Sequence, residues 1–264
     1  MTTATEISAP VSASTPARPL DLMTPKARLG IILPSSNRLC EPQFIHFAPP
    51  GLGVHFNRMR MTGPWHKPVD QMMDKIREVA GALGDSGCDA IVFNCTGTSM
   101  EEGPEAEARV INAIAEETGA IALATGKAIV DALHALAIRS LVLLSPYRQS
   151  VNDAERAYLT KMGFDVLDDL GLNLKGGNDY IHVEPQRWVQ LACEMIAAHP
   201  KADGVFLSCT NTTQIEAIPA IERLTGKACV NSNQAVLWAA SRVLAPRLGG
   251  WPREGRLGRL FGNA

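Results

Sequence analysis

Two short segments of this chain repeat one pattern, in which an apolar run leads into a polar residue, a cysteine and a threonine. DAIVF (89–93) precedes NCTGTS (94–99), and DGVFL (203–207) precedes SCTNTT (208–213). A buried strand of a parallel sheet is typically such a short apolar run, bounded by polar residues. Each cysteine is therefore expected at the carboxyl end of a strand.

The surroundings of the two segments repeat as well. Pro34 ends an earlier apolar run and lies 61 residues before Cys95, and Pro146 ends the corresponding run 63 residues before Cys209. Self-similarity at a nearly constant spacing predicts an internal duplication. If a pseudo-two-fold axis relates the two halves, the carboxyl ends of both sheets face one cleft, where open α/β folds bind ligands. Each half then contributes one cysteine to that cleft.

Apolar runs alternate with segments of helical periodicity along the whole chain, which predicts an α/β fold with parallel sheets. The predicted strands are 29–34, 54–61, 89–94, 120–125, 138–146, 164–172, 203–208 and 227–232. The predicted helices are 68–87, 101–119, 126–137, 151–163, 184–200, 212–226 and 233–246. We expect two Rossmann-like domains, each a doubly wound parallel sheet, with the active site between them.

The domain boundaries follow from this alternation. Residues 1–27 are rich in Ser, Thr, Ala and Pro and are expected to form a disordered tail. The N-terminal half is expected over 28–136 and the C-terminal half over 137–232. The last segment, 233–262, is expected to pack back on the N-terminal half as a helix.

Composition excludes several classes of function. The net charge of −2 gives no basic surface for nucleic acid or an anionic membrane. No apolar run reaches the ~18 residues of a membrane-spanning helix, and the first residues lack the apolar core of a signal peptide. The six cysteines form no CxxC pair and no zinc-like cluster with histidine. We therefore expect a reduced, cytoplasmic protein without a bound metal.

Two cysteines that face each other can act as a pair. A cysteine between a strand and a helix is expected near the N-terminal amides of the helix, which lower the pKa of its thiol. A thiolate and a thiol then form a nucleophile/acid or acid/base pair that needs no cofactor. Thr96 and Gly97 follow the first cysteine, and Thr210 and Asn211 follow the second, as candidate donors to a carboxylate or oxyanion. A single cysteine is more often a small buried hydrophobe, but the repeat favours a functional pair.

Other loops at the same rim offer polar side chains, each with a structural alternative. Asn37 either donates to a substrate carboxylate or caps a turn or helix. Tyr147 either binds an oxyanion or is a half-buried structural residue. Asn178 lies in the loop KGGND, which lacks the glycine spacing of a nucleotide site. Arg58 and Arg60 either bind a carboxylate or, as most arginines do, pair with surface acids.

An ordered set of motifs adds a family resemblance. ILPSSN, RMRM, NCTGTS, LSCTNTTQIEAIPAIE and VNSNQAVLWAA occur in this order within residues 28–262. The set resembles the aspartate/glutamate racemase superfamily, and within it the branch of maleate cis-trans isomerases and arylmalonate decarboxylases. The resemblance implies two pseudo-symmetric Rossmann-like domains, no cofactor, a small carboxylate substrate and a homo-oligomer.

The resemblance also implies roles for particular residues. In the maleate isomerases, the cysteine matched by Cys95 adds to the alkene, and the one matched by Cys209 moves a proton. Asn37, Tyr147 and Asn178 match the residues that hold the two carboxylates. The decarboxylase has glycine in place of Cys95, which favours a maleate isomerase. The open alternatives are a two-cysteine racemase of an amino or hydroxy acid, an arylmalonate-type decarboxylase, and a binding protein without turnover. Cys40 has no assigned role.

Overall fold

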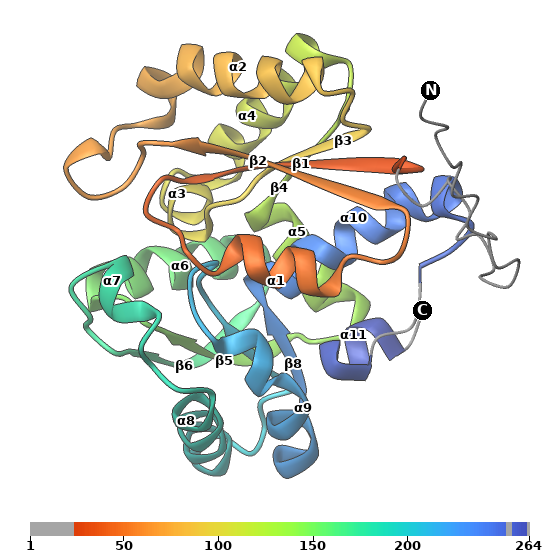
Figure 1. Ribbon diagram of the computed structural model, residues 1–264. Helices are drawn as coiled ribbons and strands as arrows, with labels where there is room; N and C mark the ends of the chain where they lie inside the picture. Colours follow the sequence, from red (N-terminus) through yellow and green to blue (C-terminus); the bar gives the residue numbers. More distant parts are fainter. Residues whose placement is uncertain (1–23, 252–254, 263–264) are drawn as a thin grey trace, which may run out of the picture.

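The computed structural model describes residues 24–251 and 255–262 (Figure 1). Most of the predicted tail, residues 1–23, lies outside the described residues. The first strand begins at Ala27, so the last residue of the predicted tail belongs to this strand.

The first sheet consists of four parallel strands. They are β1 (Ala27–Pro34), β2 (Leu52–Met59), β3 (Ala90–Phe93) and β4 (Ile121–Ala124), in the spatial order β2-β1-β3-β4. The second sheet repeats this arrangement with β5 (Ser140–Ser145), β6 (Asp165–Gly171), β7 (Gly204–Leu207) and β8 (Ala228–Asn231), in the order β6-β5-β7-β8. The same strand order in both sheets confirms the predicted fold class.

The strands form where the sequence is continuously apolar. Every residue of β3 and of β7 is buried, as expected for central strands of a sheet that is covered on both faces. The helices of the first half are α1 (Cys40–Phe47), α2 (Val69–Asp85), α3 (Thr96–Glu101), α4 (Gly103–Thr118) and α5 (Thr125–Ala135), with the 3₁₀ turn η2 (Gly63–Trp65). Those of the remaining chain are α6 (Gln149–Lys161), α7 (Gly177–Tyr180), α8 (Pro185–Ala198), α9 (Gln214–Thr225), α10 (Ser232–Leu248), η3 (Gly255–Leu257) and α11 (Arg259–Gly262).

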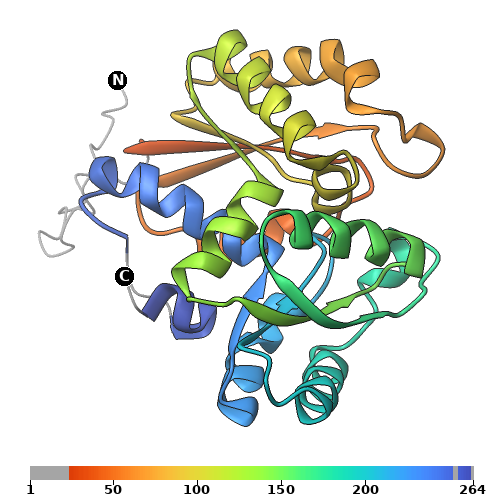
Figure 2. The same cartoon turned by 180° about the vertical axis from the view of Figure 1, so that it is seen from behind.

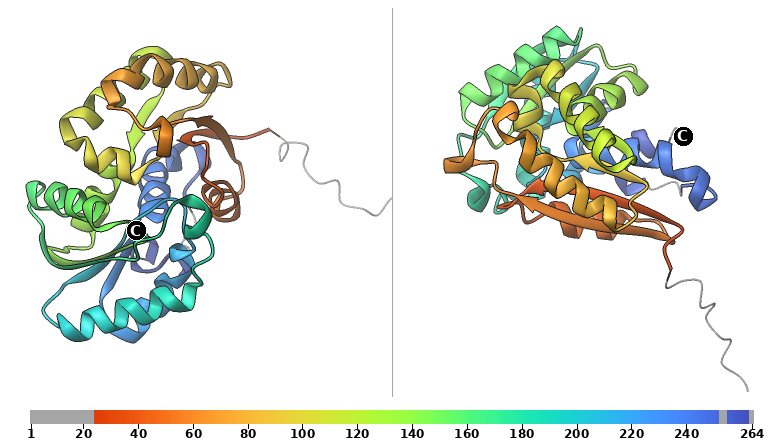
Figure 3. Two further views of the ribbon diagram at one scale, coloured as in Figure 1. Left: turned by 90° about the vertical axis from the view of Figure 1, so that its left-hand side faces the viewer. Right: turned by 90° about the horizontal axis from the view of Figure 1, so that it is seen from above.

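The helices form an outer layer on each sheet and a shared layer between the sheets. α2 and α4 cover the outer face of the first sheet, and α8 and α9 cover that of the second (Figure 1). α5 and α10 lie between the two sheets, as the view from behind shows (Figure 2). The left view of Figure 3 shows the two lobes, each a sheet with its helices, one above the other. The largest buried apolar cluster runs through this middle layer and includes residues of both lobes.

The last segment contacts both halves. α10 packs on α5 and on β1, β3 and β4 of the first sheet, and it also touches β8 of the second. η3 lies against α9, and α11 lies against β8. The structure therefore divides 233–262 into separate elements, and the domain boundaries at 136 and 232 stay a prediction.

Candidate active site

A cavity of about 790 Å³ lies at the carboxyl ends of the central strands. In the first sheet the chain leaves the adjacent strands β1 and β3 in opposite directions, and in the second sheet it leaves β5 and β7 in the same way. Open α/β sheets bind ligands at the carboxyl ends of such a strand pair. The loops after all four of these strands line the cavity, and they contribute Asn37, Cys95, Tyr147 and Cys209. The predicted meeting of the two cysteines in one cleft is therefore what the structure shows.

Cys95 stands at the junction of β3 and α3. Its backbone is extended, with φ −149° and ψ 106°, and it is the N-cap residue of α3. Its thiol donates to Thr98 Oγ1 at 3.3 Å. Only 7% of the residue is exposed, and this surface faces the cavity that it lines.

Cys209 has a different backbone setting. Its φ of +120° lies in a region that residues with a side chain rarely adopt, and such strain gathers at functional sites. The N–H of Cys209 donates to Ser232 Oγ at 3.1 Å, and the N–H of Asn211 donates to Cys209 Sγ at 3.3 Å. The predicted helix after this cysteine begins only at Gln214, so Cys209 is not next to a helix N-terminus.

The predicted lowering of the thiol pKa values is wrong for this structure. Burial raises the pKa of Cys209 to about 12, and it also raises the pKa of Cys95. Hydrogen bonds of Cys209 with Tyr147 and with the Asn211 N–H, and of Cys95 with Thr98, act in the opposite direction. The free-energy cost of desolvating a buried thiolate exceeds the stabilisation that these hydrogen bonds give it.

Asn37 lines the cavity, and its side chain also makes structural hydrogen bonds. Its Oδ1 accepts from the N–H groups of Leu39 and Cys40 at 3.1 and 2.9 Å, which caps the start of α1. Its Nδ2 donates to the carbonyl oxygen and to Oγ1 of Thr210, both at 3.1 Å. Asn37 therefore fixes the loop after β1 to the loop of the second cysteine.

Asn211 joins loops in a similar way. Its Oδ1 accepts from the N–H of Arg38 at 2.8 Å, and its Nδ2 donates to the carbonyl oxygen of Gly177 at 3.2 Å. It lines the cavity, as do Thr96, Gly97 and Thr210. Its side chain links its own loop to the segments of Arg38 and Gly177. Its contact with the sulfur of Cys209 is made by its backbone N–H.

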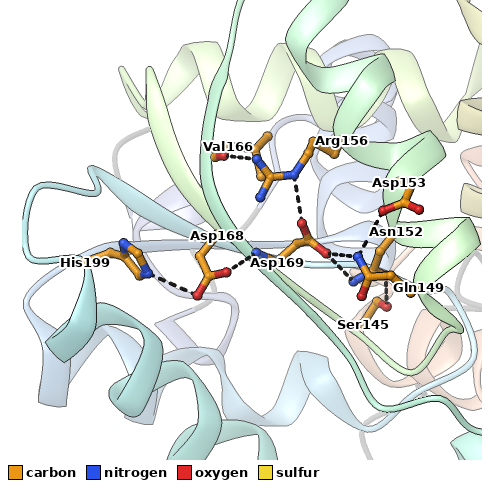
Figure 4. A network of polar contacts seen from close by, with 9 residues as sticks. All are labelled: Ser145, Gln149, Asn152, Asp153, Arg156, Val166, Asp168, Asp169 and His199. Atoms are coloured by element: carbon orange, nitrogen blue, oxygen red, sulfur yellow. Dashed lines mark hydrogen bonds and ion pairs between the residues drawn. The ribbon is translucent and has the colours of Figure 1, made fainter.

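Tyr147 lies in the loop after β5, with its ring edge-on to Tyr180 at a centroid distance of 5.7 Å. Its N–H donates to Ser145 Oγ at 3.1 Å, and Ser145 in turn bonds to Asn152 of α6 (Figure 4). Asp169 of β6 accepts from Asn152, and this network anchors the loop to α6. Burial raises the pKa of the Tyr147 phenol well above its ordinary value, so the phenol stays a hydrogen-bond donor.

The remaining candidates fall outside the cavity. Asn178 is exposed and does not line it, although its neighbours Gly176 and Gly177 do. Arg58 pairs with Glu41 at 2.7 Å, as a surface arginine was expected to do. Arg60 stacks on the ring of Trp65 at 4.7 Å.

A cluster of buried amides between the halves was missed from the sequence. Asn233 Nδ2 donates to Gln43 Oε1 at 2.7 Å and to the Thr210 carbonyl oxygen at 2.9 Å. Asn94 Nδ2 donates to Asn233 Oδ1 at 3.2 Å and to Cys40 Sγ at 3.1 Å. Cys40 is thus a buried acceptor whose pKa burial raises to about 12. The available signal was position, because Asn94 directly follows β3 and Asn233 lies two residues after the end of β8.

Comparison with known proteins identifies the family. The sequence model of the arylmalonate decarboxylase family matches residues 20–257. The chain belongs to this family. The match confirms the resemblance to the maleate isomerase and arylmalonate decarboxylase branch.

Individual relatives agree with this membership. A maleate isomerase of Geobacillus stearothermophilus is 25% identical over 210 residues, which cover 75% of this chain and 82% of the relative. An arylmalonate decarboxylase of Bordetella bronchiseptica is 28% identical over 192 residues, which cover 73% and 79%. A solved maleate cis-trans isomerase variant of Nocardia farcinica, with a covalently bound succinylcysteine intermediate, superposes with a TM-score of 0.74 at 22% identity and covers 83% of this chain and 92% of its own.

The mouth of the cavity in this family member carries charge of both signs. Arg148 and Lys175 line it and are exposed. Glu101 also lines it, and its carboxyl lies 3.9 Å from His66 Nε2. Partial burial raises the pKa of Glu101. The two cations are placed to attract an anionic substrate.

The described residues hold neither a candidate metal centre nor a candidate membrane-spanning helix. Within residues 24–251 and 255–262, no group of three or more His, Cys, Asp or Glu side chains is placed to hold a metal ion. None of the helices in this part of the chain is long and apolar enough to cross a membrane.

Proposed function

We propose that the protein is a cofactor-independent maleate cis-trans isomerase in which Cys95 is the nucleophile and Cys209 the acid and base. The observation that carries this proposal is the presence of two thiols, from equivalent strand ends of a duplicated fold, in one cavity. The relatives named maleate isomerase support it, and the succinylcysteine in the Nocardia farcinica enzyme supports covalent cysteine chemistry.

The first half of the reaction forms a thioether. The Cys95 thiolate adds to one alkene carbon, and the electron pair of the double bond moves to the other carbon, next to its carboxylate. The Cys209 thiol donates its proton to that carbon and becomes a thiolate. A pKa of about 12 keeps Cys209 protonated at neutral pH, which suits a proton donor. When Cys95 loses its proton, the Thr98 hydroxyl that accepted from the thiol can turn and donate to the thiolate.

The second half reverses these bonds. The former double bond is now single, so the two carboxylates rotate apart. The Cys209 thiolate takes a proton back, the double bond re-forms in the trans geometry, and the carbon–sulfur bond breaks with its electrons returning to Cys95. The atoms balance without an added redox group or metal, and fumarate leaves.

The cavity offers neutral donors for the substrate carboxylates. The phenol of Tyr147 and the segments Thr96–Gly97 and Thr210–Asn211 line it beside the thiols. Neutral donors withdraw electron density from a carboxylate and stabilise the charge that develops during thiolate addition. We retain Tyr147, Thr96, Gly97, Thr210, Asn37 and Asn211, which line the cavity, as substrate-binding candidates. Asn178, which lies outside the lining, stays a prediction.

The test is incubation of the purified protein with maleate in deuterated buffer, without added cofactor, followed by proton NMR. We expect fumarate from the wild type and from the control variant Cys193→Ala, whose thiol lies on α8 outside the cavity lining. We expect none from Cys95→Ala or Cys209→Ala. Unchanged maleate with folded wild-type protein would refute the assignment.

Decarboxylation is the second candidate, because the family is named for it. That reaction needs one proton donor, whereas this cavity holds two thiols, which favours isomerisation. Release of carbon dioxide from phenylmalonate would move the assignment to a decarboxylase. Exchange of the α-proton of an amino or hydroxy acid for deuterium would move it to a racemase. A cytoplasmic location and a homo-oligomer remain proposals, to be tested by cell fractionation and by sedimentation.

A further inference from the structure

A carboxyl that the proposed reaction does not use lies behind the two thiols. Glu155 of α6 is completely buried. Its Oε1 accepts from the hydroxyl of Ser208 at 2.7 Å, and Ser208 directly precedes Cys209 in the chain. Its Oε2 is buried and has no hydrogen-bond partner among the described residues. A buried charged oxygen without a partner is costly, so this geometry fits a neutral carboxyl better than a carboxylate.

The groups around Glu155 define its electrostatic setting. Glu101 of α3 and Asp169 of β6 are the acids that act on it from the elements packed against α6. Asp169 is engaged by Arg156, Gln149 and Asn152 (Figure 4). Burial and these two acids raise the pKa of Glu155 to about 8, although the bond from Ser208 lowers it.

The charge state of Glu155 in turn affects the pKa values of the groups in the cavity. A negative charge on Glu155 raises the pKa values of Cys95, Cys209 and Tyr147. Between buried groups such as these, the charge is weakly screened. An ionised Glu155 therefore works against the thiolate that the nucleophile needs.

We propose that Glu155 is a positioning residue for the thiol pair: its uncharged carboxyl favours ionisation of Cys95, and loss of the Glu155 proton slows the rise of Cys95 reactivity at alkaline pH. The proposal deepens the proposed function, on which its catalytic consequence rests. A thiol-dependent enzyme without such a group becomes more active as pH rises toward the thiol pKa. With Glu155 present, the gain slows near pH 8, where its carboxyl ionises, and this produces a break in the pH profile.

The experiment measures the thiols directly, so it does not depend on the substrate. The full chain is alkylated with iodoacetamide between pH 6.5 and 10, and the rates at Cys95 and Cys209 are followed by peptide mass spectrometry. Cys193, half-exposed on α8, is the internal control in every digest. In Glu155→Gln we expect the Cys95 rate at pH 9 to exceed that of the wild type, by about tenfold for each pKa unit that the Glu155 charge adds to the Cys95 thiol.

A second variant changes the pKa of Glu155 without removing its carboxyl. Ser208→Ala deletes a hydrogen bond that lowers the pKa of Glu155, so the break in the wild-type profile should move to higher pH. This variant also serves if Glu155→Gln does not fold. An identical Cys95 profile in the wild type and folded Glu155→Gln, or an unmoved break in Ser208→Ala, would overturn the proposal. If the profiles shift as expected while maleate stays untouched, Glu155 retains its role and only the substrate assignment falls.

Discussion

The burial of Glu155 predicts a large dependence of stability on pH. The carboxyl has a pKa of about 8 in the folded protein, against an ordinary value of 4.5. Between these values the folded protein keeps a proton that the unfolded chain has released, so the free energy of unfolding falls as pH rises. The window of about 3.5 pH units, at about 1.4 kcal/mol per unit, gives a loss of about 5 kcal/mol.

Glu155→Gln removes the titrating proton and keeps an acceptor for the Ser208 hydroxyl. Urea unfolding of the wild type and of Glu155→Gln from pH 4.5 to 8.5 gives the difference between their free energies of unfolding at each pH. The contributions of the other titrating groups are the same in both proteins and cancel in this difference. We expect this difference to shift in favour of the variant by about 5 kcal/mol across the range and to be level above pH 8.

Glu105→Gln is the control with the opposite sign. Glu105 is exposed, and a hydrogen bond from Lys161 holds the pKa of its carboxyl below the ordinary value. Its contribution to stability is present above the unfolded pKa and is lost as pH falls through the folded one, so this difference should move against the variant as pH rises. A level difference curve for Glu155→Gln would show that its carboxyl ionises normally and would refute the reasoning.

Three further predictions concern the cavity and its frame. Tyr147→Phe should lower kcat for maleate by ~100-fold in steady-state assays, the usual cost of one oxyanion donor, with an unchanged melting temperature. Arg148→Gln should raise KM several-fold, leave kcat nearly constant and weaken the salt dependence of kcat/KM, because Arg148 lines the mouth as an exposed cation. Asn231→Ala should lower the free energy of unfolding by about 3 kcal/mol in urea titrations, because it removes the capping box of α10 and buried bonds to the Leu207 carbonyl oxygen and Gln214 Oε1.

The strands were predictable because their signal is local. Each strand of the two sheets coincides with a predicted apolar run to within two residues at either end. The short helices α1, α3 and α7 were missed, since few turns give little periodicity. The predicted helix 101–119 corresponds to α4, which begins at Gly103 with a φ of +83°, whereas its first predicted residue, Glu101, is the last residue of α3.

The site was predictable where it follows from topology and not where it follows from side-chain packing. Equivalent positions in a duplicated fold brought Cys95 and Cys209 together. The thiol pKa direction was wrong because burial is a property of the assembled fold. Glu155 was missed because an acid in a helix normally faces solvent. Its spacing from Asn152 and Tyr158 nevertheless places it on the buried face of α6.

A duplicated fold brings two like thiols together, but the proposed reaction needs two unlike ones. The structure supplies the difference in the backbone and the neighbours. Cys95 is extended at a helix start with a hydroxyl partner, Thr98, that can donate to a thiolate. Cys209 has a φ of +120° and a pKa of about 12, and it directly follows the serine bonded to Glu155. The repeat thus accounts for the presence of both sulfurs, and the departures from the repeat give the two thiols the different surroundings that the proposed reaction requires.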